Sequence, residues 1–419
     1  MGKLARFQPI VHGYRMKDTE FYQQILGLNP PWKVSEVRLE MAGKRVSVKV
    51  ELEAGIKWFS PDTKEPAHVH KWKTRKWRHL DTCQFETIIE ADVPSVRHAD
   101  GSIEEVAVPW ADRYQRVTRM MAHAVVLWLK ACGNVKEVAA MMRLDWDTVD
   151  GIMKAAVSRG LERRAAEPIK HLGIDEKAFR RGHHYASLLN DLDSDRLWDM
   201  VEGRTTDNAR ELMDTLSTSQ KAAVEAVAMD MWLPFEKAVE SHLPNADIVY
   251  DKFHISAYLN KAVDDVRKAE HRELMADGDE RLKGTKFQWL RNFPDLRSVP
   301  GFRTLYAANL KTSRAWRLKE TFEGFWSYRY KVPAIRFFQE WHTKVKRSGL
   351  DPMRRVARML EERLTGVLNY LDHRITNAGS EGMNSLLARI IGQARGLRSF
   401  ATLRIRALFF LGKLDLSIA

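Results

Sequence analysis

Two stretches decide the expected fold, Leu172-Gly-Ile-Asp175-Glu176 and Ala226-Val-Ala-Met-Asp230-Met-Trp232, because each is a short apolar run that ends near a carboxylate. A third stretch, Asn377-Ala-Gly-Ser-Glu381-Gly-Met-Asn384, places a carboxylate at an expected helix start. Three carboxylates so far apart in the sequence suit a site that binds two divalent metal ions for phosphodiester chemistry.

The pattern around the first two stretches alternates between strands and helices. The expected order is strand, strand, strand, helix, strand, helix, strand, at His171 to Glu176, His184 to Leu192, Arg196 to Glu202, Asn208 to Leu216, Val224 to Asp230, Pro234 to Leu243 and Asp247 to Asp251. This is the order of a ribonuclease-H-like mixed sheet, in which ligands gather at the carboxyl ends of adjacent strands. Asp175 and Asp230 are therefore expected side by side.

The fold class expected for the whole chain combines α/β and α domains. The expected domains are a β-rich module at 1–109, a helix-turn-helix at 110–168, a ribonuclease-H-like catalytic domain at 169–255 plus 377–419, and a large helical insertion at 256–376. Alternating apolar residues at 34–53 predict a β-hairpin in the first module. The rest of that module, from 57 to 109, is irregular in pattern and is expected to be weakly cored.

Each of the three acids also has a simpler structural explanation. Asp175 could be a solvated acid at a strand end, and Asp230 could cap the helix that follows it. Glu381 could be a first-turn glutamate that the helix dipole favours. Their joint placement on a matching strand order favours the metal site, with Asp175, Asp230 and Glu381 as ligands of two Mg²⁺ or Mn²⁺ ions, since such ions prefer carboxylate oxygen.

The next strand ends in Asp251-Lys-Phe-His254, which adds two candidate catalytic residues. His254 could orient a scissile phosphate or transfer a proton, and Asp251 could support it. A purely structural Asp–His pair is the alternative. Glu176, next to Asp175, is expected to point to the opposite face of the strand.

Charge and cysteine content restrict the partner and the compartment. The 68 Lys and Arg residues exceed the 55 Asp and Glu residues, for a net charge of +13 and a pI near 9.6. This excess favours a polyanionic partner, because contacts of Lys and Arg with phosphates release counterions. Two cysteines cannot form a disulfide framework, which predicts a reducing cytoplasm, and no apolar run is long enough to predict a membrane partner.

The expected DNA contacts lie in three basic or helical segments. The stretch at 71–79 interleaves basic residues with two tryptophans, the helix pair at 134–158 has the geometry of a helix-turn-helix, and the acid-free stretch after Glu381 is rich in arginine. Solvated charged faces and a generic helical linker are the alternatives. The predicted contacts are Lys71, Trp72, Lys73, Arg75, Lys76, Trp77, Arg78, Thr148, Lys154, Arg389, Arg395 and Arg398.

Several motifs together resemble one family. The motifs are Gly173-Ile-Asp175-Glu176, Arg181-Gly-His183, Glu202-Gly-Arg204, Asp251-Lys-Phe-His254, Ser380-Glu-Gly-Met-Asn384, Trp77-Arg-His-Leu-Asp81 and the helix-turn-helix. The chain resembles the ISL-three type of bacterial insertion-sequence transposases of the DDE class. The resemblance implies a ribonuclease-H-like catalytic domain with Asp175, Asp230 and Glu381 as metal ligands, and an N-terminal region that reads terminal inverted repeats.

One departure from the family pattern concerns zinc. Members usually carry cysteine pairs of a zinc-binding module ahead of the helix-turn-helix, whereas the donors here are Cys83, His68, His70, His79 and His98. Their spacing is not that of a structural site, so we expect no structural zinc.

These observations predict a DDE transposase that cleaves and transfers DNA strands with two metal ions. Its partners are expected to be double-stranded DNA, as terminal inverted repeats and as target, and a second copy in a homodimer on DNA. A bacterial cytoplasmic, nucleoid-associated location is expected. One alternative is a non-catalytic DNA-binding protein, such as a domesticated transposase acting as a repressor or architectural factor. Another is a structure-specific nuclease on the same fold.

Overall fold

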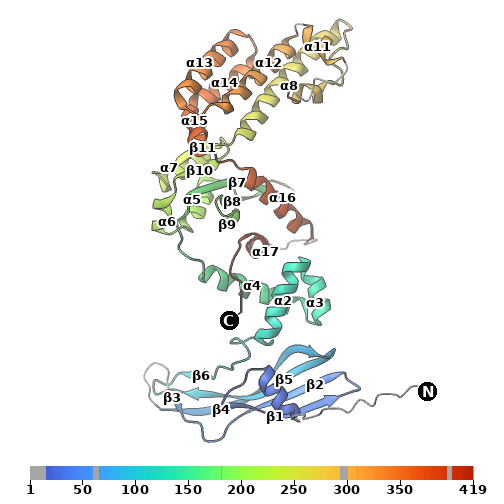
Figure 1. Cartoon of the computed structure of the whole chain (residues 1–419), viewed down its shortest axis with the longest axis vertical. Coiled ribbons are helices and arrows are strands. Elements are labelled where there is room, and N and C mark those ends of the chain that lie inside the picture. Colours follow the sequence, from blue (N-terminus) through green and yellow to red (C-terminus); the bar gives the residue numbers. More distant parts are fainter. Residues whose placement is uncertain are drawn as a thin grey trace, which may run out of the picture. The chain divides into compact units, whose positions relative to one another are not determined.

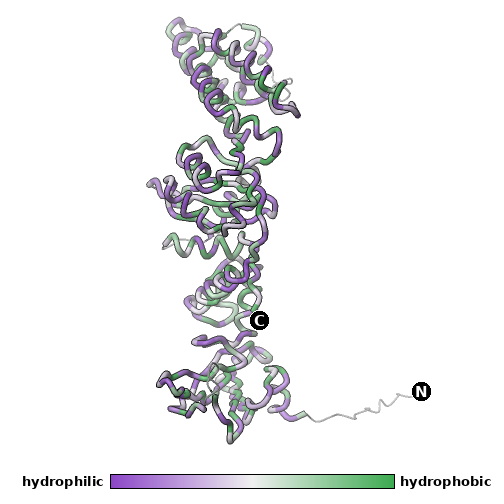
Figure 2. The backbone as a smooth tube through the Cα atoms, turned by 90° about the vertical axis from the view of Figure 1, so that its left-hand side faces the viewer, coloured by the Kyte–Doolittle hydropathy of each residue, from purple (hydrophilic) through white to green (hydrophobic). Residues whose placement is uncertain are grey.

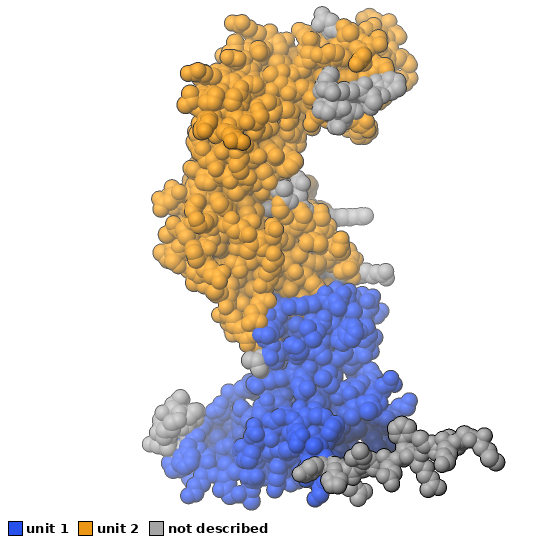
Figure 3. All heavy atoms as spheres, in the orientation of Figure 1, with its two compact units in different colours: residues 1–158, 416–419 blue, residues 159–415 orange. Residues whose placement is uncertain are grey.

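The computed structural model describes residues 16–59, 66–180, 182–292, 301–308, 310–393 and 399–418, without the side chains of Ala378, Ser380 and Glu381. The protein combines helices with mixed sheets, and it divides into two compact units (Figure 3). The first unit comprises residues 1–158 and 416–419, and the second comprises residues 159–415. In the described part of the chain, no helix combines the length and apolar character that a membrane crossing requires.

The first unit begins with a helix and a six-stranded sheet of order β1-β2-β5-β4-β3, with β6 paired to β5. The elements are α1 (Asp18–Ile25), β1 (Trp32–Glu40), β2 (Arg45–Leu52), β3 (Trp58–Phe59), β4 (Pro66–Thr82), β5 (Phe85–Arg97) and β6 (Ile103–Glu105). The antiparallel pair β1 and β2 confirms the predicted hairpin. Between β4 and β5, Cys83 and Gln84 both have positive φ, which suits a two-residue hairpin turn.

The expectation of an irregular, weakly cored region from 57 to 109 is wrong. The strands β4 and β5 are 17 and 13 residues long, and the module has a core of its own. Trp32 and Trp77 both pack edge-on against Trp110, with ring centroids 5.0 and 5.3 Å apart. In the first half of β4 most side chains are exposed on both faces of the strand. The sequence there therefore lacks the alternation of apolar and polar residues by which a strand is predicted.

Three helices follow the sheet in the sequence, and they are α2 (Arg119–Cys132), α3 (Val135–Met142) and α4 (Trp146–Glu162), of which α4 runs past Ser158, where the first stretch of this unit ends. The side chains of Thr118 and Asn134 cap α2 and α3. Asp145 accepts a 2.6 Å hydrogen bond from the Thr148 backbone N–H at the start of α4. Between α3 and α4, Arg143 has a left-handed φ of 52°, so the chain reverses in a very short link.

Polar contacts fasten these helices to the β-sheet of the same unit. The His79 Nδ1 atom lies 2.9 Å from the Thr118 hydroxyl, and burial lowers the pKa of His79 to about 4. Asp81, next to the turn between β4 and β5, forms ion pairs with Arg78 and Arg143. The stretch around Trp77 is therefore a structural junction between sheet and helices.

The second unit is built on a five-stranded mixed sheet of order β11-β10-β7-β8-β9 (Figure 1). The strands are β7 (His171–Arg180), β8 (His184–Asp191), β9 (Arg196–Glu202), β10 (Ala226–Met229) and β11 (Asp247–Tyr250). Antiparallel pairing joins β7, β8 and β9, whereas β10 is parallel to both β7 and β11. The five strands predicted along this part of the sequence are confirmed.

Helices cover this sheet, and they are α5 (Thr206–Asp214), α6 (Thr218–Ala223), α7 (Leu233–His242), α16 (Ala378–Gln393) and α17 (Phe400–Leu411). The helix α5 packs against α7, β8 and β9, while α17 packs against β9 and α16 against β7. The short helix α6 was not predicted from the sequence.

The chain between β11 and α16 is helical wherever it forms regular structure in the described residues. The elements are α8 (Lys252–Ala276), α9 (Lys286–Leu290), α11 (Phe302–Ala307), α12 (Lys311–Glu323), the 3-10 helix η1 (Gly324–Ser327), α13 (Lys331–Arg347), α14 (Asp351–Glu362) and α15 (Leu364–His373). Hydrophobic and hydrophilic residues alternate along these helices (Figure 2). Their apolar faces bury Trp289, Trp316 and Trp341, which gives this region a large aromatic core.

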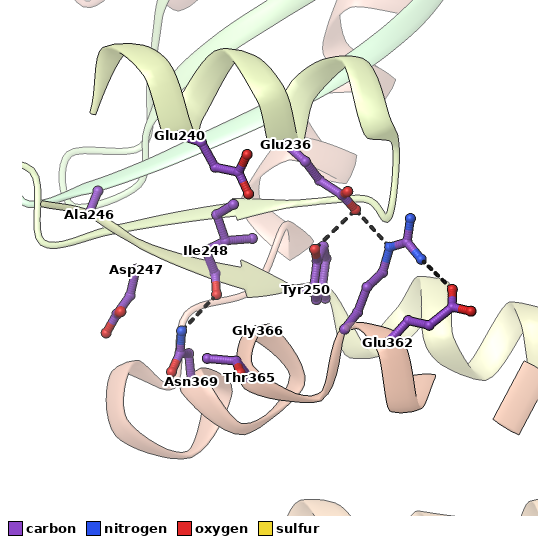
Figure 4. Close-up of a pocket in the computed structure, with 11 residues that line it drawn as sticks. Glu236, Glu240, Ala246, Asp247, Ile248, Tyr250, Glu362, Thr365, Gly366 and Asn369 are labelled. Carbon is purple, nitrogen blue, oxygen red and sulfur yellow. Dashed lines mark hydrogen bonds and ion pairs between the residues drawn. The ribbon is translucent and has the colours of Figure 1, made fainter. Parts of the chain in front are cut away.

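The last of these helices, α15, returns to the edge strand β11 (Figure 4). A Cβ atom at Gly366 would lie 2.4 Å from the Tyr250 ring, so only glycine allows this close approach. The Asn369 amide donates a 3.1 Å hydrogen bond to the Ile248 carbonyl, and Glu236 accepts hydrogen bonds from Tyr250 and Arg363. These contacts fix the strand that leads into Asp251.

Candidate active site

Asp175, on the central strand β7, and Asp230, directly after the neighbouring strand β10, lie close together on the five-stranded sheet. In the parallel pair of β7 and β10, His171 is level with Ala226, and Gly173 is level with Ala228. The same register carried two residues further brings Asp175 level with Asp230. The two apolar runs therefore bring their carboxylates to one place. Asp230 directly follows the carboxyl end of β10, whereas β7 continues to Arg180, so Asp175 lies within its strand and not near the end that the sequence predicted.

The electrostatics of Asp175 are those of a half-buried acid beside another acid. The pKa of Asp175 is raised from 3.8 to about 6, chiefly by burial and also by the negative charge of Asp230. The backbone N–H of Glu176 and the amide of Asn384 oppose this shift, with hydrogen bonds of 2.7 and 2.6 Å to the carboxylate. The site thus holds negative charge at a cost that a cation would remove.

His254 lies beside Asp230. Its Nε2 atom is 2.7 Å from the Asp230 Oδ1 atom, and this hydrogen bond raises the pKa of His254. His254 is in the first turn of α8, directly after β11, so the strand order alone positions it. The predicted His254 is therefore in contact with a predicted metal ligand.

Asp251 is buried at the N-terminus of α8 and serves the structure of the site. Its side chain accepts hydrogen bonds from the backbone N–H groups of Phe253, at 2.8 Å, and Asn377, at 2.9 Å. Burial raises the pKa of Asp251. Because its oxygens are held by backbone groups, Asp251 joins the start of α8 to the segment that leads into α16.

Two asparagines that were not predicted as site residues bring α16 to the sheet. The Asn377 amide donates a 3.2 Å hydrogen bond to the Ile174 carbonyl, and the Asn384 amide donates to Asp175. Both asparagines bound the third quoted stretch of sequence, which was the signal that could have identified them. They bring a segment some two hundred residues further along the chain to the middle of β7.

Glu381 lies on α16, three residues before Asn384, and its side chain is outside the described part of the structure. The helix begins at Ala378, so Glu381 does not open it as predicted. The predicted apolar side of this helix is buried at Met383, Leu387 and Ile390. Among the described side chains, no three His, Cys, Asp or Glu residues form a group that could hold a metal ion.

Glu176 differs from its neighbour Asp175. Its carboxylate lies 2.9 Å from the Arg204 guanidinium, which in turn stacks on the Tyr185 ring at 3.9 Å. Glu176 therefore has a cationic partner.

The predicted DNA contacts on β4 fall into three groups. Lys71, Trp72 and Lys73 are exposed, whereas Arg75 and Lys76 form ion pairs with Glu105 and Glu90. The third group is Trp77 and Arg78, which are buried, with exposed fractions of 3% and 7%, so the prediction that they contact DNA needs correction. Trp77 packs in the tryptophan core and Arg78 pairs with Asp81, so neither presents a surface on which a base could stack.

The remaining predicted contacts lie on helices or outside the described residues. Thr148 is engaged at the start of α4, where its hydroxyl donates a 2.7 Å hydrogen bond to Asp145. Lys154 is exposed on the same helix and pairs with Asp150. Arg389 is exposed on α16, whereas Arg395 and Arg398 lie outside the described residues.

Three family models match the chain in sequence. Residues 172–407 match the transposase domain of family ISL3, which covers more than half of the chain. Residues 106–157 match the helix-turn-helix domain of transposase family ISL3, and these include α2, α3 and most of α4. Residues 62–97 match a zinc-finger of the transposases of IS204, IS1001, IS1096 and IS1165.

The zinc-finger match corrects one expectation. We expected no structural zinc because the cysteine pairs of the family are missing, yet the sequence over 62–97 still matches a zinc-finger. Cysteine spacing alone was therefore the wrong criterion for this region.

Two curated relatives have similar sequences over most of their length. The transposase for insertion sequence element IS1001 of Bordetella parapertussis is 29% identical over 352 residues, which cover 81% of this chain and 86% of the relative. The transposase for insertion sequence element IS1557 of Mycobacterium tuberculosis H37Rv is 24% identical, with 78% and 79% covered.

Proposed function

The chain belongs to transposase family ISL3, and from this premise we propose that it is a DDE transposase that binds the terminal inverted repeats of an insertion sequence. It cuts the DNA strands at the ends of the element and joins them to target DNA, with two divalent metal ions at Asp175, Asp230 and Glu381. Membership of a transposase family implies DNA cleavage and strand transfer. Beyond this, we propose the metal requirement, the three metal-ligand residues and the binding of terminal inverted repeats.

One observation carries the proposal, namely the neighbouring acids Asp175, on β7, and Asp230, directly after β10. Among the described residues, neither acid forms an ion pair with Lys or Arg, and the charge of one raises the pKa of the other. Acids kept together at such a cost favour a cationic ligand. Carboxylate oxygens are the donors that Mg²⁺ and Mn²⁺ prefer, so the residues fit the ions.

Glu381 is proposed as the third acid of the site. Asn384 reaches Asp175 from α16, and residues three apart share one face of a helix. Glu381 is one turn earlier on the same helix and so belongs to the face that carries Asn384. This spacing supports the proposal independently of the family resemblance.

The chemistry divides between the ions and the protein. When bound, two such ions supply an activated nucleophile and stabilisation of the leaving oxygen. Asp175, Asp230 and Glu381 would hold the ions, and Asn384 orients the Asp175 carboxylate. His254 positions Asp230 and can donate a hydrogen bond or a proton to a phosphate oxygen. Asp251 holds the start of α8, and thereby His254, in place.

The proposed fold is a ribonuclease-H-like catalytic domain interrupted by a helical insertion. Two antiparallel pairings followed by two parallel strands, in the order β11-β10-β7-β8-β9, support the first part. Residues 256–376 would be the insertion, because β11 precedes them and α16, which returns to β7, follows them. The catalytic domain would then comprise residues 169–255 and 377–419.

The N-terminal regions would supply DNA recognition. The β-rich module (1–109) and the helix-turn-helix region (110–168) would read the inverted repeats, with Lys71, Trp72, Lys73 and Lys154 as exposed candidates. Two ends must be held together for transposition, so we propose a homodimer on DNA.

The test is an incubation of the full chain with duplex DNA taken from either side of its coding region, in the presence of Mg²⁺ or Mn²⁺. We expect strand cleavage at the element ends and joining of the freed 3′-hydroxyl to other DNA. A protein that binds these duplexes tightly but leaves them uncut in both metals is a DNA-binding protein without transposase chemistry, and the proposal is then wrong.

A further inference from the structure

A pocket of about 510 Å³ lies beside the candidate active site, on the side of α8 that turns toward the helical region. Its lining comprises Lys252, Phe253, Ser256 and Asn260 from α8, together with Leu290, Arg291, Asn292, Glu323 and Trp326. Pockets of roughly 300–1,000 Å³ are typical of small-ligand sites. Phe253 and Lys252 are next to His254 and Asp251, so this pocket adjoins the acids through the first turn of α8.

The polar groups of the pocket are incompletely paired. The Asn260 Oδ1 atom and the Trp326 Nε1 atom are both buried and have no hydrogen-bond partner among the described residues. One is an acceptor and the other a donor. Buried polar atoms are almost always paired in folded proteins, so this combination indicates a ligand or water that offers both a donor and an acceptor.

The aromatic and charged groups of the pocket restrict the class of ligand further. Trp326 is fixed by edge-on contacts with Phe322, Phe325 and Tyr370, whereas the Phe253 ring is 45% exposed. Lys252 and Arg291 bring positive charge to the rim. The pocket thus combines an accessible aromatic face, a hydrogen-bonding floor and a basic rim, which are the features that receive a base and its phosphate.

Glu323 adds a carboxyl group that can accept a hydrogen bond or, when protonated, donate one. Its carboxylate lies 3.4 Å from the Ser256 hydroxyl, and burial raises its pKa. A carboxyl group that readily takes a proton can pair with either edge of a heterocyclic base. An aliphatic ligand would leave these groups unpaired, and a purely anionic ligand would leave the Asn260 acceptor unpaired.

We propose that this pocket receives one nucleotide base of the bound DNA, displaced from its stack next to the scissile phosphate. The inference rests on the proposed function, because it supposes that DNA lies at Asp175 and Asp230. Displacing a base costs unstacking energy, and the pocket would offset that cost by stacking on Phe253 and by hydrogen bonds to Asn260 and Trp326. The pocket would thereby help to position the strand for cleavage.

The test measures whether the effects of pocket substitutions and of abasic sites on DNA binding are independent of each other. The full chain is bound to an end duplex in Ca²⁺, and the dissociation constant is measured by fluorescence anisotropy while an abasic site is moved through the positions that flank the cut. Phe253→Ala and Asn260→Leu should each weaken binding of intact DNA about tenfold. At one position, the abasic site should abolish the difference between variant and wild type, since no base remains to be held.

Phe287→Ala is the matched control. Phe287 is a 72% exposed aromatic residue on α9 outside the pocket, so this variant should bind intact and abasic DNA like the wild type. Melting curves should show that all three variants remain folded. Asn260→Leu keeps the size of the side chain, so an effect through a cavity is separated from the effect of the missing acceptor.

The outcomes separate this proposal from the proposed function. If the variants weaken binding equally for intact DNA and for every abasic position, or do not weaken it at all, the pocket does not hold a base. The same conclusion follows if a free deoxynucleoside monophosphate saturates the pocket without competing with end DNA. Failure of the wild type to cut DNA in Mg²⁺ would instead overturn the proposed function, whatever the binding data show.

Discussion

Two pairs of acids on the same sheet differ in their partners, because one pair has arginines beside it and the other does not. Asp191 and Asp199, on β8 and β9, are buried and each is paired with an arginine. Arg196 lies 2.9 Å from Asp191, and Arg404 binds both oxygens of Asp199 at 2.7 Å. At the other side of the sheet, Asp175 and Asp230 lie beside each other, and among the described residues their charged neighbour is His254.

The partners of a buried acid separate structural from functional acids in one fold. A buried acid with a bidentate arginine is satisfied by the protein itself. An acid next to another acid, with its pKa raised, is satisfied only when something else binds. We infer that the first group maintains the sheet, and that the second is retained for its ligand. The following predictions test this contrast, in order of expected effect.

The largest effect is expected on cleavage. Asp175→Asn and Asp230→Asn should each lower the rate of end cleavage by about a thousandfold or more, because each removes a proposed metal ligand. Asp199→Asn, in the fraction that remains folded, should cut at nearly the wild-type rate. Single-turnover cleavage of an end duplex in Mg²⁺ measures all three rates, and near-normal cleavage by Asp175→Asn or Asp230→Asn would show that this acid is not a ligand.

For stability we expect the reverse ranking, with the larger loss at Asp199 and little or no loss at Asp175. Asp199→Ala should lower the free energy of unfolding by about 3 kcal/mol, because it leaves Arg404 without its partner in a largely buried pair. Asp175→Asn should leave stability unchanged or raise it, since it removes an uncompensated acid. Urea denaturation of the two variants gives both values, and the contrast fails if Asp175→Asn is the more damaging substitution.

The pattern of strands could be predicted from the sequence, whereas several contacts could not. The apolar runs that end at Asp175 and Asp230 predicted adjacent parallel strands, because such runs are short and bounded by turn residues. The contact of Asn384 with Asp175 joins positions 209 apart, and periodicity carries no information about that distance. In the first unit, charges on both faces concealed β4, and basic neighbours made the buried Trp77 resemble a surface residue.

A smaller effect is expected from pH in metal-free buffer. The native pKa of Asp175 is about 6, above its ordinary 3.8, so the native state binds the proton more tightly than the unfolded state does. Between these values, stability should therefore fall as pH rises, by on the order of 2 kcal/mol from pH 4 to pH 6. The raised pKa of Asp251 acts in the same direction, whereas the raised pKa of His254 makes stability fall with rising pH only above about pH 6.5.

The control for this prediction is Asp175→Asn. Its free energy of unfolding should change less between pH 4 and pH 6 than that of the wild type, and Mg²⁺ should stabilise the wild type at the upper pH but not the variant. Equal slopes for the two proteins would mean that Asp175 is not the group that titrates.

The most direct measurement of the central claim is metal-directed cleavage of the protein itself. Fe²⁺ is allowed to replace Mg²⁺ in the full chain, and ascorbate with peroxide generates hydroxyl radicals that cut the backbone near the bound ion. We expect cuts near residues 175, 230 and 381 that excess Mg²⁺ suppresses and that Asp175→Asn abolishes. Cuts confined to other segments, or none that Mg²⁺ suppresses, would contradict the claim that these three acids bind metal together.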